Sequence, residues 1–205
     1  MVTTKASDTP TGDRRVRRTH ASLQHALIEL VEDQDLAQIN VADVAERAGV
    51  SRSTFYDHYR DVHELAEAAC TAMIDQLIES LHATLGRDSA DHAQDPTQSL
   101  RAFFASLAEH AGLYRSLLGP QGSARVIDHI RRRVIAAIHS ATGQTFAPDD
   151  LPHDVPAAFT AGALVGVAGD WLQHGCPRTP AEMAALTSPL LAAIYQTTVG
   201  TPCSP

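Results

Sequence analysis

The segment from Ile39 to Leu65, INVADVAERAGVSRSTFYDHYRDVHEL, constrains the fold of this chain more than any other stretch. Asn40 predicts a helix N-terminus, because its side-chain carbonyl can accept a hydrogen bond from a free backbone amide there. Gly49 stands where a left-handed residue would end that helix, and Ser51 can cap a second one. Two short helices joined by a three-residue turn with glycine form a helix-turn-helix, which places its second helix in the major groove of DNA. The apolar face of the first helix consists of Val41, Val44, Ala45 and Ala48.

The second helix of this motif carries the side chains that we expect to contact DNA. Phe55 and Tyr59 are four residues apart and should point inward, which leaves their neighbours toward solvent. Arg52, in the first turn, can make a bidentate contact to guanine, and Tyr56 offers a ring for a thymine methyl group. Asp57 could accept from a cytosine amino group but would be repelled by phosphate. The residues predicted to contact DNA here are Asn40, Ser51, Arg52, Ser53, Thr54, Tyr56, Asp57, His58, Arg60 and His63.

Positive charge is concentrated upstream of the motif. The formal net charge of the chain is -8, so any nucleic-acid contact must depend on local clustering rather than on overall balance. A basic arm that runs into a helix would add attraction to DNA of any sequence, and one or two of its side chains could enter the minor groove. The arm consists of Arg14, Arg15, Arg17 and Arg18.

The whole chain is predicted to be all-α, because no segment has the alternating pattern of a strand with turn residues at both ends. We expect residues 1–12 to be a disordered tail, residues 13–60 to form a helix-turn-helix DNA-binding domain, and residues 61–205 to form a helical effector-binding and dimerisation domain. A stripe of apolar residues after the basic arm should cover the two helices of the motif. This stripe consists of Leu23, Ala26, Leu27, Leu30 and Val31.

The larger domain should contain helices separated by polar or proline-containing loops. With 44% apolar residues, the chain can bury a substantial core. Residues 86–96 and 148–150 lack an apolar period and are expected to be loops. The predicted helices cover residues 61–85, 97–110, 112–118, 122–142, 154–174 and 180–199.

Cysteine usage and hydropathy predict a cytoplasmic protein. Three cysteines stand far apart without a CxxC pair, which fits free thiols in a reducing compartment. The N-terminus has no apolar region typical of a signal peptide. The most apolar run, residues 157–172, is interrupted by Asp170 and is shorter than the roughly 20 residues of a membrane span. We therefore expect no membrane association.

No catalytic, metal or cofactor site is predicted. The eleven histidines form no HExxH pattern, and the five-residue spacing of His20 and His25 turns the two rings apart on a helix. The sequence GPQGS at residues 119–123 lacks the preceding strand and the GK[ST] ending of a phosphate-binding loop. Asp170 and His174 are expected to pair at the end of a helix, where the helix dipole favours a histidine.

The sequence RSTFYDHYRD at residues 52–61, followed by HEL, resembles the form RSTFYxHYxDKxxL found in one branch of the TetR family of bacterial one-component repressors. That branch includes regulators similar to those of dihydroxyacetone kinase operons. The resemblance is strong over residues 17–65. Beyond them it rests on the helix count, on YRSLLG at residues 114–119 and on DWLQHG at residues 170–175. It implies a dimeric, all-helical repressor whose C-terminal domain binds a small molecule and releases DNA.

The resemblance also implies roles for individual residues. By position, Arg52 and Ser53 correspond to base contacts, Thr54 and His58 to phosphate contacts, and Tyr56 to both.

Two departures from the family's pattern concern phosphate contacts. Val62 replaces a lysine that usually begins the fourth helix, so Arg60 or His63 would have to supply that contact. Ala42 and Asp43 stand where a basic residue often meets the DNA backbone.

A dimer interface is predicted from the last two helices. Small residues give the first of them a bare face, and the second has an apolar stripe, so two subunits could form a four-helix contact. Packing within one subunit is the alternative. The residues predicted at the interface are Phe159, Gly162, Leu164, Gly166, Leu186, Leu190 and Ile194.

An effector pocket is predicted from the aromatic residues of the larger domain, since such pockets are apolar with few polar groups. Aromatic residues at helical spacing are more often ordinary core. The predicted lining consists of Phe103, Phe104, Tyr114, Leu117, Leu118, Phe159 and Trp171.

These features together predict a homodimeric repressor that binds a pseudo-palindromic operator DNA and is released by an unidentified small-molecule effector. Two alternatives remain open. One is a helical ligand-binding protein or enzyme that carries a helix-turn-helix, and the other is a DNA-binding regulator without an effector.

Overall fold

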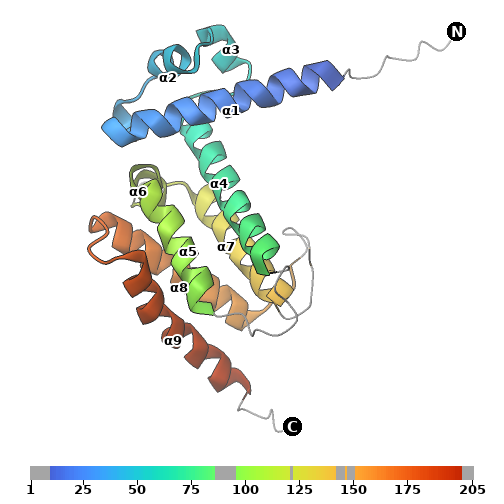
Figure 1. Ribbon diagram of the computed structural model, residues 1–205, viewed down its shortest axis with the longest axis vertical. Helices are drawn as coiled ribbons and strands as arrows, with labels where there is room; N and C mark the ends of the chain where they lie inside the picture. Colours follow the sequence, from blue (N-terminus) through green and yellow to red (C-terminus); the bar gives the residue numbers. More distant parts are fainter. Residues whose placement is uncertain (1–9, 86–95, 121, 142–145, 147–150, 200–205) are drawn as a thin grey trace, which may run out of the picture. The chain divides into compact units, whose positions relative to one another are not determined.

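A computed structural model describes residues 10–85, 96–120, 122–141, 146 and 151–199, and within these residues all regular structure is helical (Figure 1). The predicted all-α fold is therefore confirmed. The helices are α1 (Pro10–Asp33), the 3-10 helix η1 (Leu36–Gln38), α2 (Val41–Ala48), α3 (Arg52–Tyr56), α4 (Val62–Leu85), α5 (Pro96–Glu109), α6 (Ala111–Leu118), α7 (Ala124–Ala141), α8 (Val155–Gln173) and α9 (Pro180–Val199).

The chain divides into two compact units, Met1–Ala69 and Cys70–Pro205. The helix α4 begins in the first unit and continues into the second. In the first unit α2 packs against α1 and contacts α3, and both short helices lie on the same side of α1 (Figure 1). Each of α1, α2, α3 and α4 contributes fully buried side chains to this unit, namely Leu23 and Leu27 of α1, Val44 of α2, Phe55 of α3 and Leu65 of α4.

The second unit is a helical bundle in which α5 packs against α9, and α8 packs against both α6 and α7. Leu100 of α5, Leu164 of α8 and Ala184 of α9 meet in one buried cluster, against which Val134 of α7 also packs. The bundle therefore joins helices that are far apart in the sequence.

The helix α8 extends at both ends beyond the apolar run predicted at residues 157–172. Val155–Gln173 is 19 residues long and contains an 18-residue window with a mean hydropathy of 1.3, which is enough by length and composition to cross a membrane. The core helix of a globular protein passes the same test, and α8 packs against α6, α7 and α9 with residues such as Trp171 and Leu172 buried. The buried face of α8 is thus part of the core of the second unit.

The ends of the helices follow local capping chemistry. Asp154 accepts a hydrogen bond from the Ala157 amide at the start of α8, and Gly175 takes a φ of 75° just after its end. The Oγ atom of Ser123 accepts from the Val126 amide, so α7 begins at Ala124 rather than at residue 122 as expected. Oδ1 of Asp170 and Nδ1 of His174 lie 3.4 Å apart, so these residues form the predicted pair.

Two expectations about the N-terminal part were wrong. Residues 10–12 were assigned to a disordered tail and Arg14–Arg18 to an arm, but α1 already begins at Pro10, so these residues are helical. The 3-10 helix η1 was not anticipated. The rest of the expected tail, residues 1–9, residues 86–95 of the expected loop 86–96, and the expected loop 148–150 lie outside the described residues. Pro96, the last residue of the expected loop, is instead the first residue of α5.

Candidate nucleic-acid interface

The start of α2 is held by a reciprocal pair of hydrogen bonds. The Oδ1 atom of Asn40 accepts from the amides of Ala42 and Asp43, at 2.8 and 3.2 Å. In return the Asn40 amide donates to Oδ2 of Asp43 at 3.0 Å, which completes a capping box. From the sequence, Asp43 was predicted only to occupy a position where a basic residue often meets the DNA backbone. The spacing of a cap residue and a carboxylate three positions later was the signal that could have identified its structural role.

The turn between α2 and α3 is fixed by backbone geometry and a second cap. Gly49 has a φ of 67°, a left-handed conformation that glycine adopts without steric cost, and the Val50 amide donates to the Ala45 carbonyl at 2.9 Å. The Oγ atom of Ser51 accepts from the Thr54 amide at 3.0 Å. The Ser53 hydroxyl lies 2.7 Å from this same Oγ. The start of α3 is therefore positioned by neighbours in sequence.

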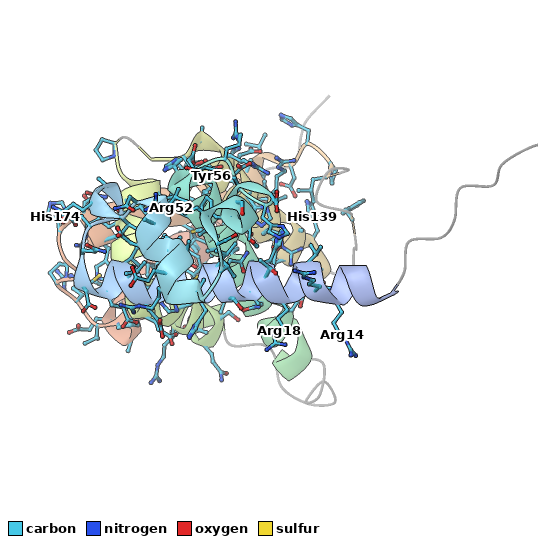
Figure 2. The ribbon with its side chains drawn as sticks, turned by 90° about the horizontal axis from the view of Figure 1, so that it is seen from above. Arg14, Arg18, Arg52, Tyr56, His139 and His174 are labelled. Carbon is cyan, nitrogen blue, oxygen red and sulfur yellow. The ribbon has the colours of Figure 1, made fainter. Side chains whose placement is uncertain are left out.

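The short helix α3 has one buried and one exposed face, as predicted. Phe55 is fully buried and Tyr59, just beyond the helix, is nearly so. Tyr56 is 60% exposed although it is a large aromatic residue. Arg52 and Ser53 are also exposed, and Figure 2 shows Arg52 and Tyr56 on this helix. The exposed set combines a guanidinium, a hydroxyl and an aromatic ring, which are groups that can contact bases and phosphates.

The residues after α3 lie in a turn and not in the helix itself. Asp57 is exposed and forms the C-cap, while His58 is partly exposed. The Nδ1 atom of His58 lies 3.1 Å from Nε2 of His20 on α1, and Nδ1 of His20 lies 3.1 Å from the Tyr59 hydroxyl. This contact of His20 was not predicted from the sequence, where the residue was weighed only as a metal ligand. Nothing in the local pattern indicates that His20 meets His58.

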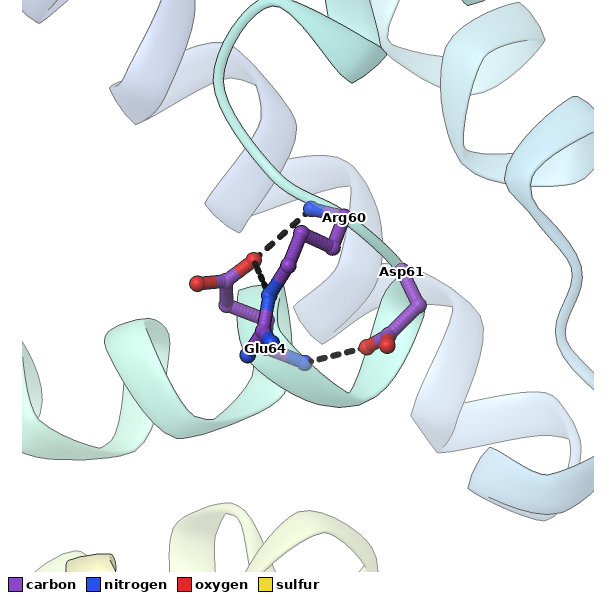
Figure 3. A network of polar contacts seen from close by, with 3 residues as sticks. All are labelled: Arg60, Asp61 and Glu64. Atoms are coloured by element: carbon purple, nitrogen blue, oxygen red, sulfur yellow. Dashed lines mark hydrogen bonds and ion pairs between the residues drawn. The ribbon is translucent and has the colours of Figure 1, made fainter.

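The two candidates for replacing the lost lysine contact both have carboxylate partners. The backbone amide of Arg60 donates to Oε2 of Glu64 at 2.7 Å, and its Nε donates to the same oxygen at 3.1 Å (Figure 3). These bonds hold the pKa of the Glu64 carboxyl below its usual value. Nε2 of His63 lies 3.6 Å from Oε1 of Glu67. Val62, at the position of the lysine, is buried.

The four arginines of α1 are exposed at the N-terminal end of that helix. Figure 2 shows Arg14 and Arg18, one helical turn apart, on this part of α1. Their neighbours Arg15 and Arg17 lie on the same segment. The carbonyls of Arg15 and Arg18 accept from the hydroxyls of Thr19 and Ser22, at 3.0 Å each. The arginine charge is thus carried on a helix and not on a flexible arm.

Comparison with known proteins identifies the group to which this arrangement belongs. The family model described as "Bacterial regulatory proteins, tetR family" matches residues 24–69, which contain α2, α3 and the start of α4. A second model, "Transcriptional regulator C-terminal region", matches residues 94–192. The chain belongs to the TetR family of transcriptional regulators. This is a family of regulators and not of enzymes, and its N-terminal helix-turn-helix binds DNA.

Individual relatives of this TetR-family chain are similar over part of their length. The uncharacterised regulator YxbF of Bacillus subtilis is 41% identical over 70 residues, which cover 32% of this chain and 18% of that protein. The regulator EthR of Mycolicibacterium smegmatis is 32% identical over 126 residues, which cover 57% of this chain and 55% of that protein. The chain thus spans little more than half, or less, of the length of these relatives.

Solved structures show the same fold at lower sequence identity. A TetR-family regulator from Streptomyces coelicolor matches with a TM-score of 0.63 and 21% identity, over 88% of this chain and 82% of that one. The dihydroxyacetone kinase operon activator DhaS matches with a TM-score of 0.60 and 16% identity, over 87% of this chain and 97% of that one. Both comparisons support the two-part helical architecture.

The residues predicted to line an effector pocket of this TetR-family chain fall into three groups. Phe104, Tyr114, Leu117 and Trp171 are buried, Phe103 and Leu118 are partly exposed, and Phe159 is 61% exposed. Phe104 meets the rings of Phe103 and Trp171 edge to face, with centroids 5.4 and 5.5 Å apart. The structure therefore brings Phe103, Phe104 and Trp171 together, whereas Phe159 faces outward.

The residues predicted at the dimer interface are mostly on exposed faces of α8 and α9. Phe159, Gly162 and Gly166 are exposed on α8, at a spacing that places them on one face, and a Cβ atom built on either glycine would meet nothing within 4 Å.

On α9, Leu186 and Leu190 are 51% and 67% exposed, and Ile194 is partly exposed. Leu164 was wrongly assigned to this face. It packs against Leu100 and Ala184 in the core of the second unit, so it is not available to a partner.

Proposed function

We propose that this TetR-family chain is a cytoplasmic homodimeric repressor that binds a pseudo-palindromic operator through α2 and α3. An unidentified small molecule bound by the second unit would release it from DNA. The observation that carries the DNA-binding part is the exposure of Arg52, Ser53 and Tyr56 on a helix whose start and inner face are fixed by caps and core packing. We also infer membership of the branch with the RSTFYxHYxD recognition sequence, because residues 52–61 match that form.

Direct base contacts would come from the first turn of α3. Arg52 can donate two parallel hydrogen bonds to the O6 and N7 atoms of guanine, which gives about 1–3 kcal/mol of discrimination against another base. Ser53 can donate to or accept from several bases, and the exposed ring of Tyr56 can contact a thymine methyl group. Thr54 and His58 would contact phosphates, which position the helix without selecting sequence.

Attraction to the DNA backbone would come chiefly from α1. Arg60 shares its Nε–H with Glu64, and His63 lies beside Glu67, so neither is a simple replacement for the lysine of the family pattern. The four arginines of α1 are exposed. Among the residues that the structure describes, Arg14, Arg15 and Arg18 have no carboxylate partner, whereas Arg17 makes another contact. Neutralising phosphates with these groups releases counterions and makes binding strongly dependent on salt.

A second copy of the chain would cover the exposed apolar face formed by Phe159, Gly162 and Gly166 of α8 with Leu186 and Leu190 of α9. The open space over the two glycines allows another helix to approach closely. Exposed leucines and phenylalanine gain stability when they leave water. An interface of this kind pairs the same patch on both subunits and generates a two-fold axis, which matches a pseudo-palindromic operator.

Effector binding is proposed for the aromatic cluster of Phe103, Phe104 and Trp171 together with Tyr114 and Leu117. Their side chains would favour a largely apolar small molecule. Phe159, which is exposed on α8, fits the proposed dimer face better than a pocket. A regulator that lacks an effector keeps the same DNA-binding unit and differs only in its response to small molecules.

Selection of bound duplexes from a random DNA pool tests the proposal. The full-length chain should enrich a two-fold related sequence, and Arg52→Ala should weaken binding to it by about 5-fold to 150-fold and relax the preference at one base pair of each half-site. Arg101→Ala, which removes an exposed arginine of the second unit, is the matched control. The proposed role of α3 would be contradicted if no sequence were enriched. It would also be contradicted if Arg52→Ala selected the same sequences with an unchanged base preference.

The effector part is tested separately with the enriched duplex. A panel of apolar small molecules is added to the complex of the full-length chain and the duplex, and release of DNA is measured. Release by one class of compound supports a sensor, whereas retention of the complex throughout the panel favours the regulator without effector.

A further inference from the structure

A chain of polar contacts connects the core of the first unit to the proposed DNA-contacting surface. It runs from the buried Tyr59 hydroxyl to Nδ1 of His20, a distance of 3.1 Å, and from Nε2 of His20 to Nδ1 of His58, also 3.1 Å. The two imidazole rings meet edge to face with centroids 4.7 Å apart. His20 is on α1 and His58 is in the turn after α3, so these bonds connect elements that are distant in the sequence.

The state of His20 limits how the protons can be arranged. Burial, and secondarily the neighbouring His58, hold the pKa of His20 below its ordinary value of 6.5. The ring is therefore neutral at pH 7, and a neutral imidazole has one N–H donor and one nitrogen that accepts. Because both ring nitrogens of His20 have partners, one of its two contacts donates and the other accepts.

Tyr59 decides which nitrogen of His20 accepts. The Tyr59 hydroxyl lies 3.1 Å from Nδ1 of His20. An imidazole nitrogen is a much stronger acceptor than a phenol oxygen, and a phenol O–H is a good donor, so Tyr59 donates in this contact. The Tyr59 O–H hydrogen is then directed at Nδ1 of His20. The proton of His20 consequently resides on Nε2 and is donated to Nδ1 of His58.

The direction of the hydrogen bond from His20 determines the tautomer of His58. Its Nδ1 accepts, so the N–H of its neutral ring must be at Nε2. Nε2 lies on the opposite side of the imidazole from Nδ1 and therefore points away from His20. It has no hydrogen-bond partner among the residues that the structure describes, and the side chain is partly exposed. A donor directed outward beside an exposed recognition helix is suited to a phosphate oxygen.

We propose that His20 is a positioning residue for DNA binding, which donates from Nε2 to His58 and thereby presents the Nε2–H of His58 to a backbone phosphate. The inference rests on the proposed function, in which His58 contacts the backbone. It assigns to α1 a role in setting the chemistry of the turn after α3. A purely structural role for His20, as a tie between α1 and that turn, would require a hydrogen bond but would not require the proton of His58 on Nε2.

The first test measures the tautomer of His58 in the full-length chain without DNA. Long-range proton–nitrogen correlation spectra of protein with nitrogen-15 histidine distinguish the two neutral tautomers. We expect both His20 and His58 to carry the proton on Nε2 at pH 7. A proton on Nδ1 of His58 would overturn the proposal.

The second test uses a matched pair of substitutions at His20. A glutamine amide nitrogen reaches about as far along the side chain as Nε2 of histidine, whereas an asparagine amide reaches only to the level of Nδ1. His20→Gln should keep the donor to His58 and bind the selected duplex within about twofold of the wild type. His20→Asn should lose the donor and bind it about fivefold more weakly. Equal weakening by both, or none by His20→Asn, would overturn the proposal.

A double-mutant cycle with His58→Asn completes the test, because this substitution removes the outward donor itself. In its presence His20→Asn should cause no further loss of affinity, and a full additional loss would contradict the coupling. Failure of the wild-type chain to select any duplex would count against the proposed function. The tautomer measurement is made without DNA, so it decides the arrangement of His20 and His58 separately.

Discussion

The helix pairs α2–α3 and α8–α9 expose opposite kinds of side chain. On α3 the exposed residues are Arg52, Ser53 and the amphipathic Tyr56. On α8 and α9 they include Phe159 and Leu190, at 61% and 67% exposure. Polar groups on α3 are hydrated in the free protein and can exchange water for DNA. The apolar face of α8 and α9 gains free energy, roughly 25 cal/mol for each Å² covered, only when another apolar surface excludes water from it.

The two pairs also differ in what holds them in place. α2 and α3 are positioned by caps from residues within a few positions, such as Asn40, Asp43 and Ser51. α8 and α9 depend on side chains from distant helices, because Leu164 and Ala184 share a core with Leu100 of α5. Caps formed by neighbouring residues suit a surface whose side chains must be held in an accurate orientation. A core built from helices that are distant in the sequence suits a surface that presents a broad apolar face.

The largest effect is expected from a charge on the apolar face. Leu190→Glu would require a carboxylate to be buried in the proposed dimer interface, which is strongly unfavourable. We expect a shift from dimer to monomer in analytical ultracentrifugation, and operator binding weakened by at least about 100-fold because the two DNA-binding units no longer act together. Ala105→Glu, at an exposed position of α5, is the control. A dimer that persists in Leu190→Glu would remove this face from the interface.

The next effect concerns the arginines of α1. The double variant Arg14→Ala/Arg18→Ala should reduce the slope of log affinity against log salt by about 1.8, since each phosphate contact contributes about 0.9. Binding should weaken similarly for all DNA sequences. The control is Arg101→Ala/Arg178→Ala, which removes the same charge from the second unit. An unchanged slope would show that Arg14 and Arg18 do not meet the backbone.

A smaller effect is expected from the cap of α2. Asn40→Ala removes the acceptor for two amides and should lower the free energy of unfolding of the first unit by about 1 kcal/mol. The free energy of unfolding is measured by denaturant titration, monitored through a signal that comes from the first unit. Glu46→Ala, an exposed position on the same helix, should change stability by less than about 0.5 kcal/mol. If Asn40→Ala is equally harmless, the capping box does not hold α2.

The smallest effect is a change in acid sensitivity at Glu64. Its folded pKa lies below the usual 4.5, first because of the Arg60 amide and then because of the Arg60 guanidinium. The carboxylate therefore favours the folded state above about pH 4.5, and this contribution is lost as the pH falls through the lower folded value. Because the Glu64 side chain is partly exposed, solvent screens part of the effect.

Glu64→Gln should accordingly make the melting temperature fall less steeply with pH below 4.5 than it does in the wild type. Glu46→Gln removes a carboxylate of the same unit that makes no such bond among the described residues, and serves as the control. Parallel melting profiles for Glu64→Gln and the wild type would contradict the role of the Arg60–Glu64 contact.

Local sequence was sufficient to predict most of the DNA-binding unit. Asn40, Gly49 and Ser51 were identified from capping and turn chemistry, and the structure confirms each of these local roles. The inward direction of Phe55 and Tyr59 followed from helical spacing and is also confirmed. Such features depend on neighbours within about four positions, so the residues that make them can be found by spacing alone.

Prediction was weaker where a residue's partner is far away in the sequence. The apolar pattern of α8 does not show that Leu164 turns inward to Leu100 while Phe159 turns outward. The contact between His20 and His58 joins residues 38 positions apart. The helical state of Arg14–Arg18 was also missed, because a run of arginines after a polar tail has no cap or apolar stripe to mark it.

The sequence by itself determined the helical fold class, the position of the helix-turn-helix and the residues exposed on α3. These follow from caps, turn glycines and apolar spacing, which act over one or two helical turns. Only the tertiary structure decided which apolar residues of α8 and α9 are left uncovered, and which residue contacts the ring of His58. Both depend on distant segments meeting, and the burial of a side chain or the direction of a hydrogen bond is fixed only when its partner is in place.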